Sequence, residues 1–296
     1  MNPTESSFES PSDGTRIVTQ TWSGDTHPVG VVQIAHGLAE HSLRYGRLAA
    51  ALVAAGYRVH ASDHRGHGKS IPAQGRPGDF GEAGFAGLVA DVSAFSARIA
   101  ADEPGLPLYL IAHSMGSIAA QEVILEHSVR YAGVVLSGST AVDVLGANLA
   151  SEPAGADEPS GLEAFNAGFE HRTGYEWLSR DEAEVDLYVA DPLCGFDLPD
   201  DALTQMFAQA ARLADPTALA AIRPDLPLLL VSGQADPLSG DGQLIELLAQ
   251  RYREAGLTDV RVQVYPEARH EIFNETNREA ITADVIAWID AHRAAG

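Results

Sequence analysis

Apolar and polar positions divide the chain into two kinds of segment that alternate. Val29–Ala35 and Leu108–Ala112 are nearly continuous apolar runs, as is typical of strands that are buried on both faces of a parallel sheet. Phe85–Ala100 instead has apolar residues every three or four positions, which predicts a helix with one buried stripe. This alternation predicts an α/β fold with a mostly parallel central sheet that is flanked by helices.

The same two patterns recur in order along the chain. Phe8–Ser10 and Thr15–Trp22 flank a turn of proline, aspartate and glycine, which predicts an antiparallel hairpin at the start. The helices fall between consecutive strands, as the crossover connections of a parallel sheet require. Further strands are predicted at Tyr57–Ser62, Gly133–Leu136, Leu226–Ser232 and Val260–Tyr265, and further helices at Tyr45–Ala55, Leu244–Gly256 and around Ile281–Ile289.

The alternation is interrupted in the middle of the chain. Between Thr140 and Ile222 the pattern predicts amphipathic helices instead of strands. Ser179–Glu182 has the capping-box pattern and predicts the start of one helix, which ends before Pro192. Two other stripes are formed by Leu162, Phe165 and Phe169, and by Leu203, Met206, Phe207 and Ala210. We therefore expect a first part of the core over residues 1–139, an inserted helical cap over residues 140–222 and a second part of the core over residues 223–296.

Composition sets limits on partners and location. The net charge of −22 repels nucleic acid and anionic lipid headgroups. We find no apolar stretch of the length that crosses a bilayer, so we expect no stable membrane insertion. Met1–Ser12 lacks the charged and apolar regions of a signal peptide. Cys194 is the only cysteine, which excludes an internal disulfide and favours a cytoplasmic protein.

Ser114 lies where the predicted strand Leu108–Ala112 passes into a helix that begins near Met115. The sequence A-H-S-M-G at this point has the form of the G-x-S-x-G nucleophile elbow. Such a sharp turn needs small residues two positions before and after the serine, and Ala112 and Gly116 supply them. The alternative is a serine in an ordinary strand-to-helix connection, so the rest of the chain must decide.

A serine hydroxyl is a poor nucleophile unless a base removes its proton. In elbows of this kind the acid and then the histidine follow the serine along the chain. His270 lies in the loop after the predicted strand Val260–Tyr265, where it can reach over the end of the sheet. His292 lies in the last helix and is predicted to be a solvated surface residue. We therefore assign the base to His270.

Asp236 follows the predicted strand Leu226–Ser232 at its carboxyl end, where the acid is expected. Its role would be to accept the Nδ1–H of the histidine and to stabilise the imidazolium. The alternative for Asp236 is a turn-forming residue before Pro237. Asp225 lies at the wrong end of the strand, and Asp241 is interpreted as the N-cap of the next helix.

The oxyanion of an acyl-transfer reaction needs two backbone donors. One is the N–H of Met115, the residue after the proposed nucleophile. The other is expected in the loop after Val29–Ala35, where Gly37 allows the turn and the N–H of Leu38 can point inward.

Other residues with chemical potential are interpreted as structural. His60, His64 and His67 lack carboxylates at ligand spacing, so no metal site is predicted there. Cys194 is expected to be a small buried hydrophobic residue.

Four motifs resemble those of the monoacylglycerol lipase-like α/β-hydrolases, a group that overlaps with lysophospholipases and serine aminopeptidases. They are H-G-L-A-E-H-S-L-R-Y at 36–45, D-H-R-G-H-G-K-S at 63–70, A-H-S-M-G at 112–116 and H-E-I-F-N-E at 270–275. The resemblance covers the whole core and is weak across the cap. It implies an α/β-hydrolase fold with an inserted helical cap.

The resemblance also implies a Ser–His–Asp triad and an oxyanion hole at the positions already inferred from chain order. The family usually has glycine at Ala112 and Ser117, and these departures could change turnover. The triad is Ser114, Asp236 and His270, and the oxyanion donors are Leu38 and Met115.

We expect a serine hydrolase that cleaves carboxylic esters of single-chain lipids through an acyl-enzyme, with no cofactor and no metal. The apolar stripes of the cap are expected to line an acyl site through Phe165, Phe169, Met206 and Phe207. One alternative is a serine aminopeptidase, similar to the proline iminopeptidases, in which acidic cap residues hold a free amine. Another is a non-catalytic protein of the same fold that binds a small molecule, although the complete triad counts against it.

Overall fold

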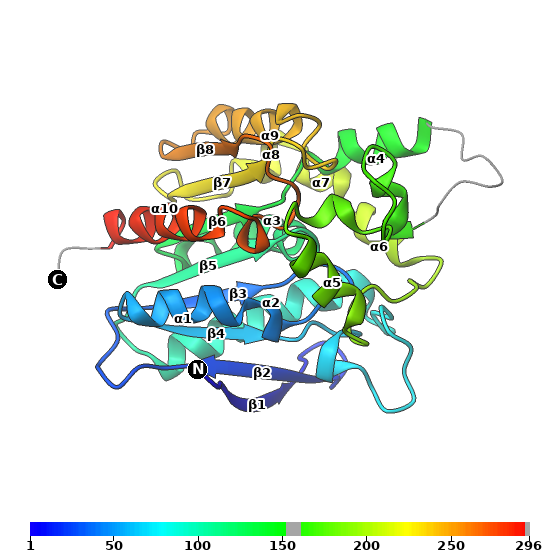
Figure 1. Ribbon diagram of the computed structural model, residues 1–296. Coiled ribbons are helices and arrows are strands. Elements are labelled where there is room, and N and C mark those ends of the chain that lie inside the picture. Colours follow the sequence, from blue (N-terminus) through cyan, green and yellow to red (C-terminus); the bar gives the residue numbers. More distant parts are fainter. Residues whose placement is uncertain (152–160, 294–296) are drawn as a thin grey trace.

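The protein is built around one sheet of eight strands in the order β1-β2-β4-β3-β5-β6-β7-β8 (Figure 1). The computed structural model describes residues 1–151 and 161–293. The strands are β1 (Thr4–Glu9), β2 (Arg16–Trp22), β3 (Gly30–Ala35), β4 (Tyr57–Ser62), β5 (Leu108–His113), β6 (Gly133–Ser137), β7 (Leu228–Gly233) and β8 (Val260–Tyr265). Only the pairs β1–β2 and β2–β4 are antiparallel, so the predicted mostly parallel sheet is confirmed.

The first strand is longer than its sequence predicts. β1 begins at Thr4 and pairs with β2 along its whole length, from Thr4 opposite Thr21 to Glu9 opposite Arg16. Only Phe8 of this edge strand is buried, and the polar residues before it give no apolar signal. The other strands agree with their predicted bounds to within two residues.

Helices cover both faces of the sheet. α1 (Gly46–Ala54) and α10 (Arg278–Ala291) pack in one apolar cluster on one face. α2 (Gly84–Asp102), α3 (Met115–His127) and α9 (Gln243–Glu254) pack in a second cluster on the other face (Figure 1). Because both faces are covered, the central strands are apolar at nearly every position, which is the pattern seen in the sequence.

One helix differs from the expectation that no stretch is apolar enough to cross a membrane. By length and composition α2 meets that criterion. Its buried stripe, which includes Leu88 and Val92, packs within the core cluster, and Asp91 on the same helix forms a buried ion pair with Arg65. In this structure α2 is therefore a core helix that flanks the sheet.

The segment between β6 and β7 consists of short helices, and the described part of it contains no strand. Figure 1 shows α4, α5 and α6 grouped together beyond one end of the sheet. The boundaries of the predicted cap at residues 140 and 222 stay predictions. The helices of this segment are α4 (Val142–Ser151), η4 (Gly161–Asn166), η5 (Glu176–Leu178), α5 (Glu182–Ala190), α6 (Ala202–Phe207), α7 (Ala210–Leu213) and α8 (Pro216–Leu219).

Two predicted helix starts are wrong in detail. α5 begins at Glu182, and Asp181 is its N-cap, accepting from the Ala183 N–H at 3.1 Å. Ser179 instead donates its hydroxyl to the Asn274 carbonyl at 2.9 Å. Asp241 is not the N-cap of α9, because that position is occupied by Gly242 and the exposed Asp241 has a φ of 55°.

Candidate active site

Ser114 lies in a strained turn between β5 and α3. Its φ is 51°, a left-handed value that is rare for a residue with a side chain. A Cβ at Gly116 would lie 2.4 Å from the Ala35 carbonyl oxygen, so only glycine allows α3 to approach β3 this closely. Ala112 is fully buried in β5, where it pairs with Ala35. The turn therefore holds its shape with alanine in place of the first usual glycine.

His270 and Asp236 form a buried hydrogen-bonded pair. The distance from His270 Nδ1 to Asp236 Oδ2 is 2.9 Å, and both side chains are almost inaccessible to solvent. The other oxygen of Asp236, Oδ1, accepts from the Leu238 N–H at 2.9 Å, so the residue also forms the turn that its alternative interpretation predicted. Burial disfavours a charged ring, but the nearby carboxylates, with Asp236 foremost, together outweigh burial and raise the pKa of His270.

The ring of His113 connects the histidine loop with the serine elbow. His113 directly precedes Ser114, and its ring centroid lies 4.7 Å from that of His270. Gly138, with a φ of 54°, leaves room for both rings, because a Cβ there would lie 2.9 Å from each of them. Burial lowers the pKa of His113 to about 3, so its ring is neutral.

The loop after β3 lies against the elbow. A Cβ at Gly37 would lie 3.2 Å from the Ser114 Cβ, and the Gly37 N–H already donates to Glu40 Oε1 at 2.5 Å. Within residues 1–151 and 161–293, the N–H groups of Leu38 and Met115 donate to no protein acceptor. Met115 is the first residue of α3, where the partial positive charge of a helix N-terminus favours an anion. No described protein group competes for these two donors, and their role as oxyanion donors stays a prediction.

Part of the predicted cap packs directly on the histidine loop. The Trp177 ring lies 4.8 Å from the His270 ring, and the Trp177 carbonyl accepts from the His270 N–H at 3.2 Å. The Leu178 carbonyl accepts from the next N–H, that of Glu271, at 2.7 Å. Nothing in the sequence pattern around Trp177 indicated this contact, because it joins residues that are far apart in the chain.

The four predicted acyl-site residues divide into two groups. Phe165 packs on Trp177 at 5.2 Å between ring centroids, and the Arg269 guanidinium lies over the Phe169 ring at 4.7 Å. On α6, Met206 packs within the cluster that contains Met115, while Phe207 packs both against that cluster and against the one that contains Trp177. Both groups are thus connected to the elbow or the histidine loop through packed neighbours, and their role in binding an acyl chain stays a prediction.

A buried ionic network lies beside the candidate triad and was missed by the sequence analysis. Arg44 pairs with the carboxylates of both Glu40 and Glu271. Burial opposes ionisation of Glu271, but the Arg44 charge and hydrogen bonds lower its pKa to about 2. Glu40 and Arg44 belong to the motif at 36–45 and Glu271 to the motif at 270–275, so a signal was present but suggested no pairing.

The histidines that raised the question of a metal site are packed into the core. His64 donates its backbone N–H to His36 Nε2 at 2.9 Å, and His67 Nδ1 lies 2.9 Å from the Arg65 carbonyl. Burial lowers the pKa of His64 to about 3 and that of His67 to about 4, so both are neutral. His60 hydrogen-bonds Thr21 between neighbouring strands. Their contacts are those of structural residues.

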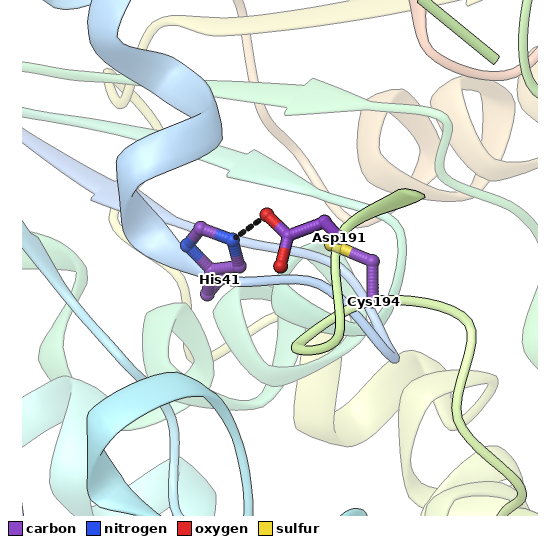
Figure 2. Close-up of side chains that lie close together, drawn as sticks. All are labelled: His41, Asp191 and Cys194. Atoms are coloured by element: carbon purple, nitrogen blue, oxygen red, sulfur yellow. Dashed lines mark hydrogen bonds and ion pairs between the residues drawn. The ribbon is translucent and has the colours of Figure 1, made fainter. Parts of the chain in front are cut away.

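A different group of residues comes closer to a metal-binding arrangement. The side chains of His41, Asp191 and Cys194 converge, with their potential ligand atoms within 4.8 Å of one another (Figure 2). His41 Nε2 and Asp191 Oδ2 already form a 2.9 Å hydrogen bond, and burial raises the pKa of the Cys194 thiol. A divalent cation would have to displace both that bond and the thiol proton. What the arrangement provides as it stands is a polar link between the loop after β3 and the segment after α5.

One predicted surface residue is less exposed than expected. His292 Nε2 lies 2.9 Å from Asp259 Oδ2, and Nδ1 lies 2.7 Å from the Trp288 carbonyl. Its side chain is only 11% exposed. His292 therefore links the end of α10 to the core rather than lying in solvent. Its hydrogen bonds are to Asp259 and Trp288 and not to His270.

Comparison with known proteins extends the geometric picture. Residues 26–277 match the family model described as "Serine aminopeptidase, S33". A monoacylglycerol lipase of Mycolicibacterium smegmatis is 33% identical over 288 residues, which cover 94% of each chain. A monoglyceride lipase of Homo sapiens is 29% identical over 283 residues, covering 90% of this chain and 87% of that protein. A thermostable carboxyl esterase from Bacillus coagulans, solved in complex with glycerol, has a TM-score of 0.86 at 25% identity and covers 99% of this chain and 100% of its own.

Proposed function

The chain belongs to the serine aminopeptidase S33 family of α/β-hydrolases, and we propose that it hydrolyses monoacylglycerols and similar single-chain esters through Ser114. Its relatives and structural neighbours make it a carboxylic ester hydrolase. The observation that carries the proposal is the strained Ser114 turn beside the buried His270–Asp236 pair. A turn of this kind presents the hydroxyl at the tip of the elbow, where a substrate carbonyl can reach it.

In the proposed acylation step, the Ser114 Oγ attacks the ester carbonyl carbon while His270 Nε2 accepts the hydroxyl proton. Asp236 holds the ring in the orientation that leaves Nε2 unprotonated, because its carboxylate binds Nδ1–H. The negative charge that develops on the carbonyl oxygen is stabilised by the Leu38 and Met115 N–H groups. When the tetrahedral intermediate collapses, His270 returns the proton to the leaving alcohol, and the acyl group remains on Ser114.

Deacylation repeats these steps with water. His270 removes a proton from the water as it attacks the acyl carbonyl, and the same two N–H groups stabilise the second oxyanion. Collapse of this intermediate transfers the proton to Ser114 Oγ and releases the carboxylic acid. Every proton transfer is between protein and substrate groups, so no step of the cycle requires a cofactor.

The choice of a single-chain lipid ester rests on the apolar side chains of the proposed cap and on the names of the relatives. Phe165 packs on Trp177, which in turn packs on His270, so apolar surface extends outward from the reaction centre. A single acyl chain placed along such surface gains transition-state affinity with each buried methylene.

An aminopeptidase would need an anionic group in the cap that is free to bind the substrate amine. Among the described cap residues, the carboxylates of Glu176 and Glu184 are buried, and both have protein partners. Glu176 accepts from Thr173 and Asn166, and Glu184 pairs with Arg47. Neither of these two buried carboxylates is free to hold an amine, which counts against them as an amine site.

The test is a chain-length series of neutral p-nitrophenyl esters and 1-monoacylglycerols. We expect kcat/KM to rise about fourfold per methylene, which corresponds to about 0.8 kcal/mol, until the acyl site is full. Phe207→Ala should flatten the series at long chains, and Ser114→Ala should abolish it. A flat series, together with rapid cleavage of free but not N-acetylated aminoacyl-amides, would instead support the aminopeptidase.

A further inference from the structure

We propose that Arg44 is a positioning residue of the ester hydrolase: it fixes the position of the loop that carries Leu38 relative to the loop that carries His270. The proposal rests on the roles proposed above for those two residues. Arg44 follows β3 in the chain and lies in η1 (Ser42–Tyr45), outside the triad and the oxyanion hole. It touches none of the reacting atoms, so any effect on the reaction must be exerted through the two loops.

The first contact of Arg44 is with the histidine loop. Its guanidinium donates to both carboxylate oxygens of Glu271, from Nη1 to Oε1 and from Nη2 to Oε2, the latter at 2.7 Å. Asn274 donates to the same Oε2 at 2.9 Å. Glu271 is the residue next to His270, so a two-point grip on this carboxylate restricts the rotation as well as the position of the loop.

The second contact is with the loop after β3. Nη1 of Arg44 donates to Glu40 Oε2 at 2.8 Å. The other oxygen, Glu40 Oε1, accepts from the Gly37 N–H at 2.5 Å and from the Tyr45 hydroxyl at 2.7 Å. Because Glu40 occupies the Gly37 N–H, the next N–H along the chain, that of Leu38, is the one left to face a ligand. Arg44 is thus connected, through the side chain of Glu40, to the loop after β3 that carries Leu38, which we call the oxyanion loop.

Helix α5 also contacts Arg44 and the loop after β3. The Arg44 guanidinium lies over the Tyr188 ring at 4.8 Å, and the Tyr188 hydroxyl donates to the Ala39 carbonyl at 3.0 Å. Ala39 has a φ of 53°, so its backbone is held in a conformation that alanine rarely adopts. Only 10% of the Arg44 side chain is exposed. The contacts that surround Arg44 therefore fix the shape of the oxyanion loop with little access for water.

Stabilisation of the fold alone does not account for these buried charges. Two carboxylates face one guanidinium, and a buried ion pair seldom gives more stability than well-packed apolar side chains. The arrangement does supply a fixed separation between an oxyanion donor and a base. The charge of Glu271 also acts on the adjacent imidazole, because it favours the protonated form of His270. These are contributions to the reaction rather than to folding.

The test compares variants at Arg44 and Glu271 with a control that has matched geometry. Arg251 pairs with both oxygens of Asp143 and joins α9 to α4, so Arg251→Gln removes a similar ion pair without touching either loop. The assay uses p-nitrophenyl butyrate, and the melting temperature of each variant is measured alongside. Arg44→Lys keeps the charge but loses the two-point contact with Glu271.

We expect Arg44→Gln to lower kcat by about 10²-fold with KM changed less than about threefold, because a misplaced catalytic group costs about that much. Arg44→Lys should lose about tenfold, and Arg251→Gln should stay within about twofold of the wild type. Glu271→Gln should shift the acidic limb of kcat/KM to lower pH, because the imidazolium loses a nearby anion. A merely structural role would lower the melting temperature without lowering kcat at unchanged KM in protein that is still folded at the assay temperature.

The proposal would be overturned if Arg44→Lys had the same kcat as the control variant Arg251→Gln. If Arg44→Gln and Arg44→Lys fail to fold, Glu271→Gln decides, because it disrupts the two-point contact with Arg44. A kcat of Glu271→Gln equal to that of Arg251→Gln then overturns the proposal. The failure of the proposed function has a different signature: Ser114→Ala would then retain the activity of the wild type. In that case the activities of the Arg44 variants are still compared with that of Arg251→Gln, because this comparison does not depend on which residue is the nucleophile. Equal activities again overturn the positioning role.

Discussion

At the scale of the residue, Ser114 shows how stability is given up for reactivity. A left-handed φ for a residue with a Cβ costs on the order of 1–3 kcal/mol, whereas glycine adopts it freely. The cost is tolerated because the elbow is held by neighbours that leave no alternative, such as Gly116 against the Ala35 carbonyl. The nucleophile thus occupies a position that packing imposes rather than one that its own backbone prefers.

We therefore expect Ser114→Gly to be more stable than Ser114→Ala, by about 1 kcal/mol. Glycine removes the backbone strain, and its greater freedom in the unfolded chain offsets only about 0.5–1 kcal/mol of that gain. Both variants lack the hydroxyl, so the difference reports the backbone alone. Urea unfolding of the two proteins measures it, and a less stable glycine variant would mean that the elbow stores no strain.

The ionisation of His270 gives a second prediction at this scale. A general base must be neutral, and the Asp236 carboxylate raises the pKa of His270 above its ordinary value of 6.5. We expect kcat/KM to fall on acidification with an acidic limb above pH 6.5. Asp236→Asn removes the anion, so the limb should move to lower pH while the rate falls about 10⁴-fold.

His292→Ala is the control for this pH profile, since His292 contacts Asp259 and Trp288 and no residue of the candidate triad. Its acidic limb should coincide with that of the wild type. A wild-type limb at or below pH 6.5 would contradict the raised pKa. If the acidic limb disappeared in His292→Ala but not in His270→Ala, the base would be His292 and the assignment to His270 would be wrong.

Chain order was sufficient to select Ser114, Asp236 and His270 as candidates, because each follows a strand that the apolar pattern reveals. Arg44 and Glu271 could not be paired in this way. They are 227 residues apart, and their contact depends on how two loops meet at the end of the sheet. Asp241 and His292 were misassigned for a related reason, since local sequence does not fix the conformation of a turn or the burial of a helix end.

At the scale of the element, the strands were predicted more accurately than the helices of the predicted cap. A strand buried on both faces has an unbroken apolar pattern, and β4 and β8 have the predicted bounds. The segment around Phe165 instead forms the short 3₁₀ helix η4, which ends before Phe169, and the stripe around Met206 divides between α6 and α7. Short helices depend on tertiary packing rather than on their own periodicity, so the sequence gives less information about them.

The contact between η5 and the histidine loop leads to a prediction about Trp177. Trp177 is buried between Phe165 and His270, so Trp177→Ala leaves a large cavity on both. We expect the free energy of unfolding to fall by about 3 kcal/mol, and kcat to fall at temperatures where the variant is folded, because the His270 ring loses its packing. Chemical unfolding and steady-state kinetics on the same preparation measure the two effects.

Leu187→Ala on α5 is the matched control for Trp177→Ala. Leu187 is 63% exposed, so its truncation should change the free energy of unfolding by less than about 0.5 kcal/mol and leave kcat unchanged. If Trp177→Ala lost stability but kept the kcat of Leu187→Ala, Trp177 would serve only the packing of η5.

At the scale of the whole molecule, the dominant feature is the excess of 41 acidic over 19 basic residues. A buried pair such as Arg65 with Asp91 is little affected by salt, and exposed pairs contribute about 0–1 kcal/mol each. The unpaired excess repels itself across the surface, and folding brings these charges closer together. The sign of the salt response is therefore set by repulsion rather than by ion pairing.

We expect the free energy of unfolding in urea to rise between 0.02 M and 0.5 M NaCl, since the Debye length falls from roughly 20 Å to about 4 Å over this range. Replacing the exposed Asp25, Glu82 and Glu279 by Asn, Gln and Gln lowers the repulsion directly. That variant should be more stable than the wild type at low salt and should gain less from added NaCl. The series is repeated with sodium sulfate, which also stabilises proteins because it is excluded from their surface. Exclusion should stabilise both proteins equally, so the difference between their gains measures screening alone. A wild type that loses stability as NaCl is added would show that its ion pairs, and not its excess of carboxylates, control the response.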